Sequence, residues 1–413
     1  MSVKFPILFI GLSFLCLTSF AQNNFNISGT VRDDRETISG AAIYLSGTKI
    51  STITNNEGKF TLAKLPVGNY DVLIQVVGYL PYSKNIIISD KSVDIDVLLK
   101  ANMVTLNEVV IKPDPNRLMY INTFKRFFLG QTPNAAMCQI LNSDVLLVDY
   151  DRLNNVLLVN SNEFLIIENK ALGYRIKYLL KYFEYNYNTH IMFYAGFPFF
   201  EEMKGSKAKI KKWNKKRNEA YYGSYQHFFK SLYQGISQKE GFVIYKLATI
   251  ENKNRLPDST INANIKKLTA GQKAINILTF NKNDSLNYWL KERSKPKTMA
   301  VLNKALVNTD TLVKTCNNDL KSINYTDDLF VVYTKEKEAE AYMQSGFYVN
   351  RTPDIGNAQV SLVSLLEPPI LFYPNGGITN PRSFLFKGIW AYEKMADSVP
   401  AEFEPTDTLS FRR

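Results

Sequence analysis

The chain has 413 residues, a formal net charge of +12 at pH 7 and a hydrophobic fraction of 45%. This length corresponds to two or three domains, and the apolar fraction is ordinary for a folded protein, which excludes disorder throughout the chain. With 2 His and 3 Cys in the chain, most metal-centred and thiol-rich designs are excluded as well.

Residues 1–21 have the pattern of an export signal. Lys4 supplies a positive N-terminal region, residues 6–20 form an apolar stretch, and Ser19-Phe20-Ala21 is a small-x-small cleavage site. An uncleaved N-terminal anchor is the alternative, but the apolar stretch is shorter than the roughly 20 residues of a membrane span. We therefore expect a signal peptide at 1–21 and a mature chain that begins at Gln22.

The mature chain is expected to lie in the periplasm or at the outer membrane. Cys16 invites a lipoprotein interpretation, but Leu15 stands where a small residue should precede a lipidated Cys, so lipidation is not expected. No later segment has about 18 consecutive apolar residues, so no transmembrane helix is expected in the mature chain.

Residues 24–100 have the pattern of an all-β module. Apolar and polar residues alternate over 25–31, and residues 55–58 and 65–68 have turn composition. About seven short strands at 8–12-residue spacing indicate a β-sandwich. The turn at 55–58 could be imagined as a Ca²⁺ loop, but only Glu57 is charged there, so a plain hairpin turn is preferred.

Three runs in this module resemble a known family: ISGTV (27–31), GAAIYLSGT (40–48) and TITNNEGKFTLAKLPVGNYDVLIQVVGY (52–79). They are similar to the carboxypeptidase-regulatory-like (transthyretin-like) domain of exported Bacteroidota proteins, with Asn55 where that family usually has Asp. The resemblance implies a β-sandwich over 22–104. It implies no activity, because such modules are attached to receptors, peptidases and proteins of unknown role alike.

Residues 105–115 are expected to be a short linker strand that ends in a proline-stiffened segment. The run LNEVVI (106–111) resembles the segment that follows this domain in TonB-dependent receptors. A receptor also needs a plug and a barrel of about 22 strands, and the remaining residues are too few for both. We expect the sandwich to be hinged to the rest of the chain, so that limited proteolysis between Leu106 and Asn116 releases two folded pieces.

Residues 116–413 are expected to form a larger α+β domain with a predominantly antiparallel sheet. The apolar spacing predicts a helix over 116–129, and a long helix over 206–233 with Ser206 as its N-cap and Gly235 after its end. Strands are expected at 144–148, 155–159, 164–168, 174–180, 191–194, 241–245, 274–280, 329–334, 359–363 and 370–373.

Four segments of this region carry a second resemblance: 169–185, 211–232, 328–334 and 388–405. They are similar to the C-terminal region of uncharacterised Bacteroidota proteins that have the same regulatory-like domain in front. This resemblance implies no catalytic residues.

The segment from Lys204 to Arg217 contains eight cations and no acid, with Trp213 among them. One interpretation is an anion or nucleic-acid platform with aromatic stacking. The other is an amphipathic helix whose aromatics pack inward while its lysines face water, and the three-to-four spacing of the following aromatics favours this one. Export argues against nucleic acid, so Lys207, Lys211 and Lys215 are candidate contacts to an anionic outer-membrane surface or an envelope protein.

Catalytic motifs are scarce. Neither His190 nor His227 starts an H-x-x-E motif or has a third ligand nearby, which excludes a zinc peptidase, and His227 is expected to be packed or to cap a helix. The nucleophile elbow, the P-loop and the dinucleotide-binding fingerprint do not occur. Glu201-Glu202 and the pair Glu336 and Glu338 could belong to a glycosidase site, although solvated charge is their usual role. We expect no catalytic residue, metal or cofactor.

Two functions therefore remain. The first is a non-catalytic exported protein with a binding or scaffolding role at the cell envelope. The alternative is a hydrolase of unrecognised type in residues 116–413. Cys138 and Cys316, the cysteines left after signal removal, could form one disulfide in an oxidising compartment or stay as separate thiols.

Overall fold

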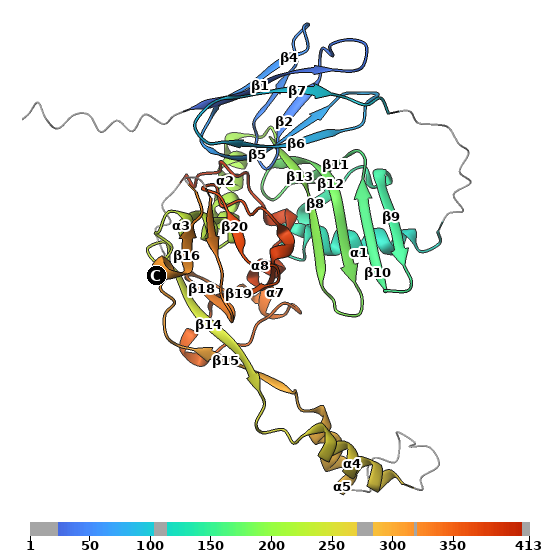
Figure 1. The fold of residues 1–413 in the computed structure, drawn as a ribbon, viewed down its shortest axis with the longest axis vertical. Helices are drawn as coiled ribbons and strands as arrows, with labels where there is room; N and C mark the ends of the chain where they lie inside the picture. The colour runs from blue at the N-terminus through green and yellow to red at the C-terminus, as the bar shows by residue number, and fades with distance from the viewer. Residues whose placement is uncertain (1–23, 103–113, 271–283, 318–319, 407–413) are drawn as a thin grey trace, which may run out of the picture.

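The computed structural model describes residues 24–102, 114–270, 284–317 and 320–406. The predicted signal peptide, most of the linker strand and the strand expected at 274–280 lie outside these residues. Figure 1 shows a sandwich across the top of the molecule and two sheets side by side beneath it. An arm projects downward from the sheet that contains β14 and β15.

The N-terminal module is a sandwich of a three-stranded and a four-stranded sheet. The first has the order β4-β1-β7, with β1 parallel to β7, and the second has the order β3-β2-β5-β6 and is antiparallel. Alternate residues such as Ile27, Val31 and Ile74 are fully buried between the sheets, as the period-two pattern predicts. The strands are β1 Phe25–Arg32, β2 Ala42–Leu45, β3 Ser51–Ile53, β4 Lys59–Leu65, β5 Gly68–Gln75, β6 Tyr82–Ile88 and β7 Val93–Leu98.

The next part of the chain forms an antiparallel sheet covered by one helix. Strand β12 pairs along one edge with β11 and then β10, and along the other edge with β13. Helix α1 (Arg117–Leu129) packs on this sheet through Phe124, which contacts Phe183 edge to face, and Phe128, which contacts Tyr178 in the same way. The strands are β8 Cys138–Ile140, β9 Leu146–Asp151, β10 Val156–Ser161, β11 Phe164–Asn169, β12 Tyr174–Asn186 and β13 Met192–Glu202.

The last part of the chain forms a second antiparallel sheet of order β15-β14-β18-β19-β21 and a small sheet of order β16-β17-β20. Between these sheets and helix α3 lies a second core that contains Phe228, Phe242 and Trp390. The strands are β14 Phe242–Glu251, β15 Thr298–Asn303, β16 Val313–Thr315, β17 Lys321–Ile323, β18 Asp328–Lys337, β19 Ala358–Leu365, β20 Ile370–Phe372 and β21 Phe384–Gly388. The other helices are α2 Lys207–Tyr221, α3 Tyr225–Tyr233, α4 Asp258–Thr269, α5 Asp284–Ser294, α6 Thr309–Leu312, α7 Glu340–Met343 and α8 Ile389–Tyr392.

The single helix predicted over 206–233 is wrong: the structure has two, α2 and α3, with a break at Tyr222-Gly223-Ser224. Gly223 adopts φ +76°, a left-handed conformation that favours glycine and ends a helix. Ser224 then starts α3, because its hydroxyl accepts a hydrogen bond from the His227 amide. The aromatic stripe expected on one helix is therefore divided between two helices.

The sandwich docks on the first sheet through the loop between β2 and β3. The Gly47 amide donates to the Pro198 carbonyl at 2.6 Å, and the Phe200 amide donates to the Thr48 carbonyl at 3.0 Å. The Tyr44 ring contacts the rings of Phe164 and Phe199. The expectation of a free hinge is thus corrected, since backbone hydrogen bonds and buried rings join the two parts directly.

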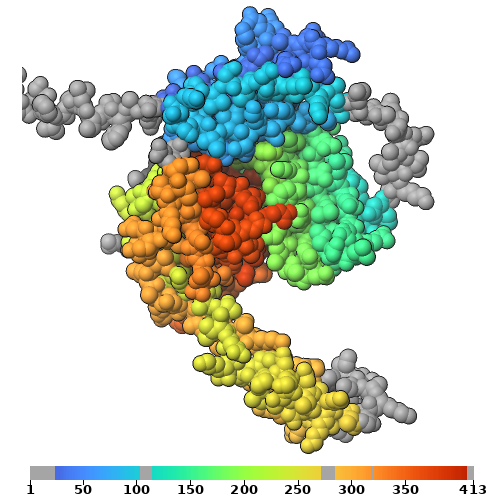
Figure 2. Space-filling view, viewed as in Figure 1, coloured from blue at the N-terminus to red at the C-terminus, as the bar shows by residue number. Residues whose placement is uncertain are grey.

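The arm consists of the outer ends of β14 and β15 and the helix pair α4 and α5 (Figure 2). Both helices, strand β15 and strand β21 were absent from the predicted elements. Within the described residues, no helix has both the length and the hydropathy that a membrane crossing requires. The predicted fold class is confirmed: an N-terminal β-sandwich precedes a larger α+β part whose sheets are antiparallel.

Candidate functional site

Helix α2 is held in place by its inner face. Ser206 caps its N-terminus by accepting a hydrogen bond from the Lys209 amide, and Lys, Ala and Arg residues favour the helical conformation. Trp213 is 2% exposed, and its indole N–H donates to the Lys170 carbonyl at 3.0 Å. A Cβ on Gly173 would lie 2.1 Å from the indole ring, so only glycine allows the ring to reach this depth.

Arg217 anchors the same face one turn later. Its guanidinium donates to the carbonyls of Leu172 and Gly173 and lies 4.0 Å from the centre of the Tyr174 ring. It also lies 3.5 Å from the Glu202 carboxylate. Arg217, one of the eight cations of the basic segment 204–217, is therefore a buried structural residue. It is 5% exposed and stabilises the turn between β11 and β12.

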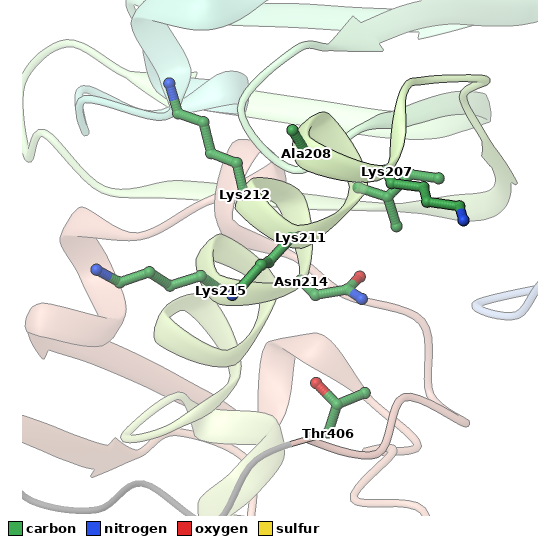
Figure 3. Close-up of a pocket in the computed structure, with 8 residues that line it drawn as sticks. Lys207, Ala208, Lys211, Lys212, Asn214, Lys215 and Thr406 are labelled. Atoms are coloured by element: carbon green, nitrogen blue, oxygen red, sulfur yellow. The ribbon is translucent and has the colours of Figure 1, made fainter.

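The outer face of α2 is a solvent-exposed basic surface. Lys207, Lys211 and Lys215, the candidate contact residues, all line one open groove of about 670 Å³, together with Ala208, Ile210, Lys212, Asn214 and Thr406. Figure 3 shows that the lysine ammonium groups spread apart: those of Lys212 and Lys215 extend to one side of the helix, and that of Lys207 extends to the other. We call Lys207, Lys211, Lys212 and Lys215 the lysine face.

The lysine face has little compensating acid. Lys215 lies 3.9 Å from Glu219, whose carboxylate is bonded more closely, at 2.7 Å, to Lys216. Among the residues that the structure describes, Lys207, Lys211 and Lys212 take part in no ion pair within 4.0 Å. Spread, uncompensated ammonium groups suit an extended anionic surface better than a single small anion, which needs donors that converge on one point.

The two histidines differ in their surroundings: His227 is packed in the core and His190 is exposed. His227 is 3% exposed among aromatic rings, its Nδ1 accepts from the Gly223 amide, and its Nε2 lies 3.3 Å from Glu240. Burial lowers the pKa of His227 to about 4, although the Glu240 carboxylate acts in the opposite direction. His190 is exposed, and its Nδ1 lies 3.0 Å from the Tyr185 hydroxyl.

The carboxylates considered for a glycosidase site have structural partners. Glu201 is paired with Lys177 at 2.7 Å, and Glu202 with Lys49 at 2.9 Å. Glu338 is buried against Arg351 at 2.7 Å. Glu336 accepts from the Gln359 amide at 3.0 Å, and burial raises its pKa to about 7. Among the described residues, no group of three His, Cys, Asp or Glu side chains is placed to hold a metal ion.

Residues 388–403, which lie in one of the segments that carry the second resemblance, connect the other parts of the molecule. The Trp390 indole donates to the Gly223 carbonyl, the Ala396 carbonyl accepts from Asn169, and the Ala401 amide donates to the Gly47 carbonyl. The buried Asp397 carboxylate accepts from Thr132 and Asn134. Sequence reasoning gave this segment no element and no role, because each contact is with a residue far away in the chain.

The two cysteines of the described chain are separate thiols. Cys138 is half-buried, its thiol lies 3.4 Å from the Asn134 carbonyl, and burial raises the pKa of that thiol to about 12. Cys316 is exposed. The sequence left open a disulfide or two separate thiols, and the structure has two separate thiols.

Residues 27–111 match the family described as CarboxypepD_reg-like domain, which confirms the first resemblance. A 112-residue stretch is 32% identical to a TonB-dependent receptor from Formosa agariphila and spans 25% of this chain and 10% of that receptor. The resemblance of residues 169–405 to uncharacterised proteins stays a prediction.

Similar solved structures include a type II cohesin–X-dockerin complex from Acetivibrio cellulolyticus, with 22% identity, a TM-score of 0.18, and coverage of 19% of this chain and 58% of that chain. A putative carbohydrate binding protein from Bacteroides uniformis is 14% identical, with a TM-score of 0.17, and the match covers 35% of this chain and 52% of that chain. A catechol 1,2-dioxygenase from Acinetobacter is 10% identical, with a TM-score of 0.18, and the match covers 20% of this chain and 54% of that chain. These TM-scores are too low to assign a function.

Proposed function

We propose that this chain is a non-catalytic, exported protein of the cell envelope that binds an anionic membrane surface through the lysine face of α2. The observation that carries the proposal is the geometry of that face: lysines spread along the outside of a helix whose inside is fixed by Trp213 and Arg217. A rigid helix presents its charges without first having to become ordered, which favours association.

Two further observations support an envelope location. The first 21 residues have the pattern of an export signal. Residues 27–111 match the CarboxypepD_reg-like domain, and a stretch of the chain is similar to a TonB-dependent receptor, which supports an envelope location. Mass spectrometry of the native protein should find a mature N-terminus near Gln22, and an intact Met1 in the cytosol would contradict the export.

The hydrolase alternative has weaker support. His227 has an acid partner, Glu240, but its ring is enclosed by aromatic side chains and both of its nitrogens are already within reach of a partner. The side chain is only 3% exposed, and burial lowers its pKa to about 4, so it is a poor proton acceptor near neutral pH. A catalytic His must reach the proton that it transfers.

The experiment is co-sedimentation of the mature chain with vesicles. We expect binding to phosphatidylglycerol-containing vesicles, weaker binding at higher salt, and little binding to phosphatidylcholine vesicles. The triple variant Lys207→Gln, Lys211→Gln, Lys215→Gln should lose about 3 kcal/mol of binding free energy, or roughly 100-fold in affinity, at about 1 kcal/mol for each lysine near an anionic surface.

The matched control replaces three exposed lysines of the sandwich: Lys84→Gln, Lys91→Gln and Lys100→Gln. Both variants lose the same charge, so a general electrostatic attraction would weaken both equally. The proposal requires that the first variant lose much more affinity than the control. Equal losses, or binding to neutral vesicles that neither variant changes, would refute it.

A further inference from the structure

Strand β15 is a free edge of the second sheet. It pairs with β14 from Thr298 to Asn303, and the sheet order places it at the end of the sheet. Beyond Leu247, β14 leaves β18 and pairs with β15 alone, so the arm contains a two-stranded ribbon (Figure 1). A two-stranded ribbon is marginally stable by itself in water, and additional strands stabilise it.

The hydrogen-bond pattern of the ribbon defines which backbone groups are free. The Asn252 amide donates to the Lys297 carbonyl at 2.9 Å, and the strand register continues from this pair. Residues 297, 299, 301 and 303 therefore direct their backbone groups toward β14. Thr298, Ala300 and Leu302 direct their N–H and C=O groups away from it, toward the open edge.

One face of the ribbon is apolar and exposed. Ile250 is opposite Met299, and Ala248 is opposite Val301, so these four side chains lie on the same face. Ile250, Met299 and Val301 are 45%, 41% and 42% exposed. Residues 298–303 contain no charge and no proline, which are the usual means by which an edge strand prevents pairing with another chain.

We propose that β15 pairs with β15 of a second copy of this chain, in antiparallel orientation around a two-fold axis at Ala300. In this register Ala300 is opposite Ala300 of the second copy, Met299 is opposite Val301, and Thr298 is opposite Leu302. The three residues with outward backbone groups then meet only one another, so each free N–H and C=O on this edge is paired. The apolar faces of the two ribbons also join into one four-stranded face.

The charges of the arm fit this orientation. The described residues of its outer end, 253–270 and 284–297, contain eight Lys or Arg and three Asp or Glu. The inner end of the ribbon is next to Asp328, which is opposite Leu247, and Lys304 there is bonded to Asp354. Antiparallel pairing places the basic outer end of each copy beside the inner end of the other, where Asp328 and Asp354 balance Lys246 and Lys304. Lys297 then faces the uncharged Asn303 of the second copy.

Sedimentation equilibrium of the mature chain tests the proposal, which does not depend on the function proposed for the lysine face. We expect a dimer that Ala300→Pro abolishes. The proline removes an N–H that points to solvent in the monomer, so the monomer should keep its melting temperature while the dimer loses two hydrogen bonds at its centre.

A charge exchange at the two-fold axis identifies the occupant of the edge. Ala300→Glu and Ala300→Lys should each raise the dimer dissociation constant about fivefold or more, since like charges are then directly opposed. An equimolar mixture of these two variants should restore dimerisation, whereas Thr61→Glu, an exposed control on β4 of the sandwich and outside the arm, should leave it unchanged. A chain that is monomeric at every concentration, or a dimer that ignores these substitutions at Ala300, would overturn the proposal.

Discussion

The inner and outer faces of helix α2 belong to the same lysine-rich sequence and have opposite roles. The inner face contributes Trp213 and Arg217, which are buried and bonded to the carbonyls of the turn before β12. The outer face contributes the lysine face, which is exposed. The difference indicates that folding stability depends on the inner face, which leaves the outer face free for binding.

The largest expected effect is on the inner face. Trp213→Ala, or Phe228→Ala in α3, should lower the free energy of unfolding by about 3–5 kcal/mol, the cost of truncating a buried large aromatic residue. Thermal or urea unfolding measures this loss. Tyr288→Ala on α5, where the side chain is 54% exposed, is the control and should cost much less. A stable Trp213→Ala variant that loses vesicle binding would mean that the indole binds a ligand.

The docking of the sandwich is expected to be weaker than the inner-face packing but still measurable. If a protease site introduced between Leu106 and Asn116 is cut, the two folded pieces should remain associated through the β2–β3 loop. Tyr44→Ala removes two ring contacts, each worth about 0.5–1.5 kcal/mol beyond burial, and should let the pieces separate on gel filtration. If the pieces separate without this substitution, the docking contacts are too weak to hold them, and the sandwich is joined to the rest of the chain only through the linker.

His227 provides a pH-dependent test of the inner packing. Its pKa is lowered from 6.5 to about 4 in the folded protein, so the unfolded chain takes up a proton that the folded protein does not. Its contribution to stability is present above pH 6.5 and is lost as the pH falls from 6.5 toward 4. His227→Gln should therefore show a smaller loss of stability than the wild type over this interval in urea titrations. Identical slopes for both proteins would contradict this assignment.

The smallest effect on stability is expected at the outer face. The triple substitution of Lys207, Lys211 and Lys215 by Gln should change the free energy of unfolding by no more than about 0.5 kcal/mol, because exposed charges contribute little. Differential scanning calorimetry would detect a larger change. A strongly destabilised triple variant would show that these lysines support the fold, and the contrast between the two faces would then disappear.

The sequence predicted local elements well where their pattern is local. Period-two alternation identified the strands of the sandwich, and helical spacing identified α1 to within one residue. The helix break after Tyr221 had a readable signal in Gly223-Ser224, a left-handed glycine followed by an N-cap residue. The arm was missed for different reasons: β15 is largely exposed and shows no period-two burial, whereas α4 had a readable helical spacing in Ile261, Ile265 and Leu268.

By itself the sequence determined the composition of each candidate surface: the basic run of α2, the scarcity of histidine, and the regulatory-like module at 27–111. The tertiary structure alone decided which of the eight cations are structural, because the position of Arg217 on the buried side depends on where the Leu172 and Gly173 carbonyls lie. It alone showed the docked sandwich and the free edge of β15, because both depend on pairing between residues far apart in the chain, and local periodicity carries no information about such contacts.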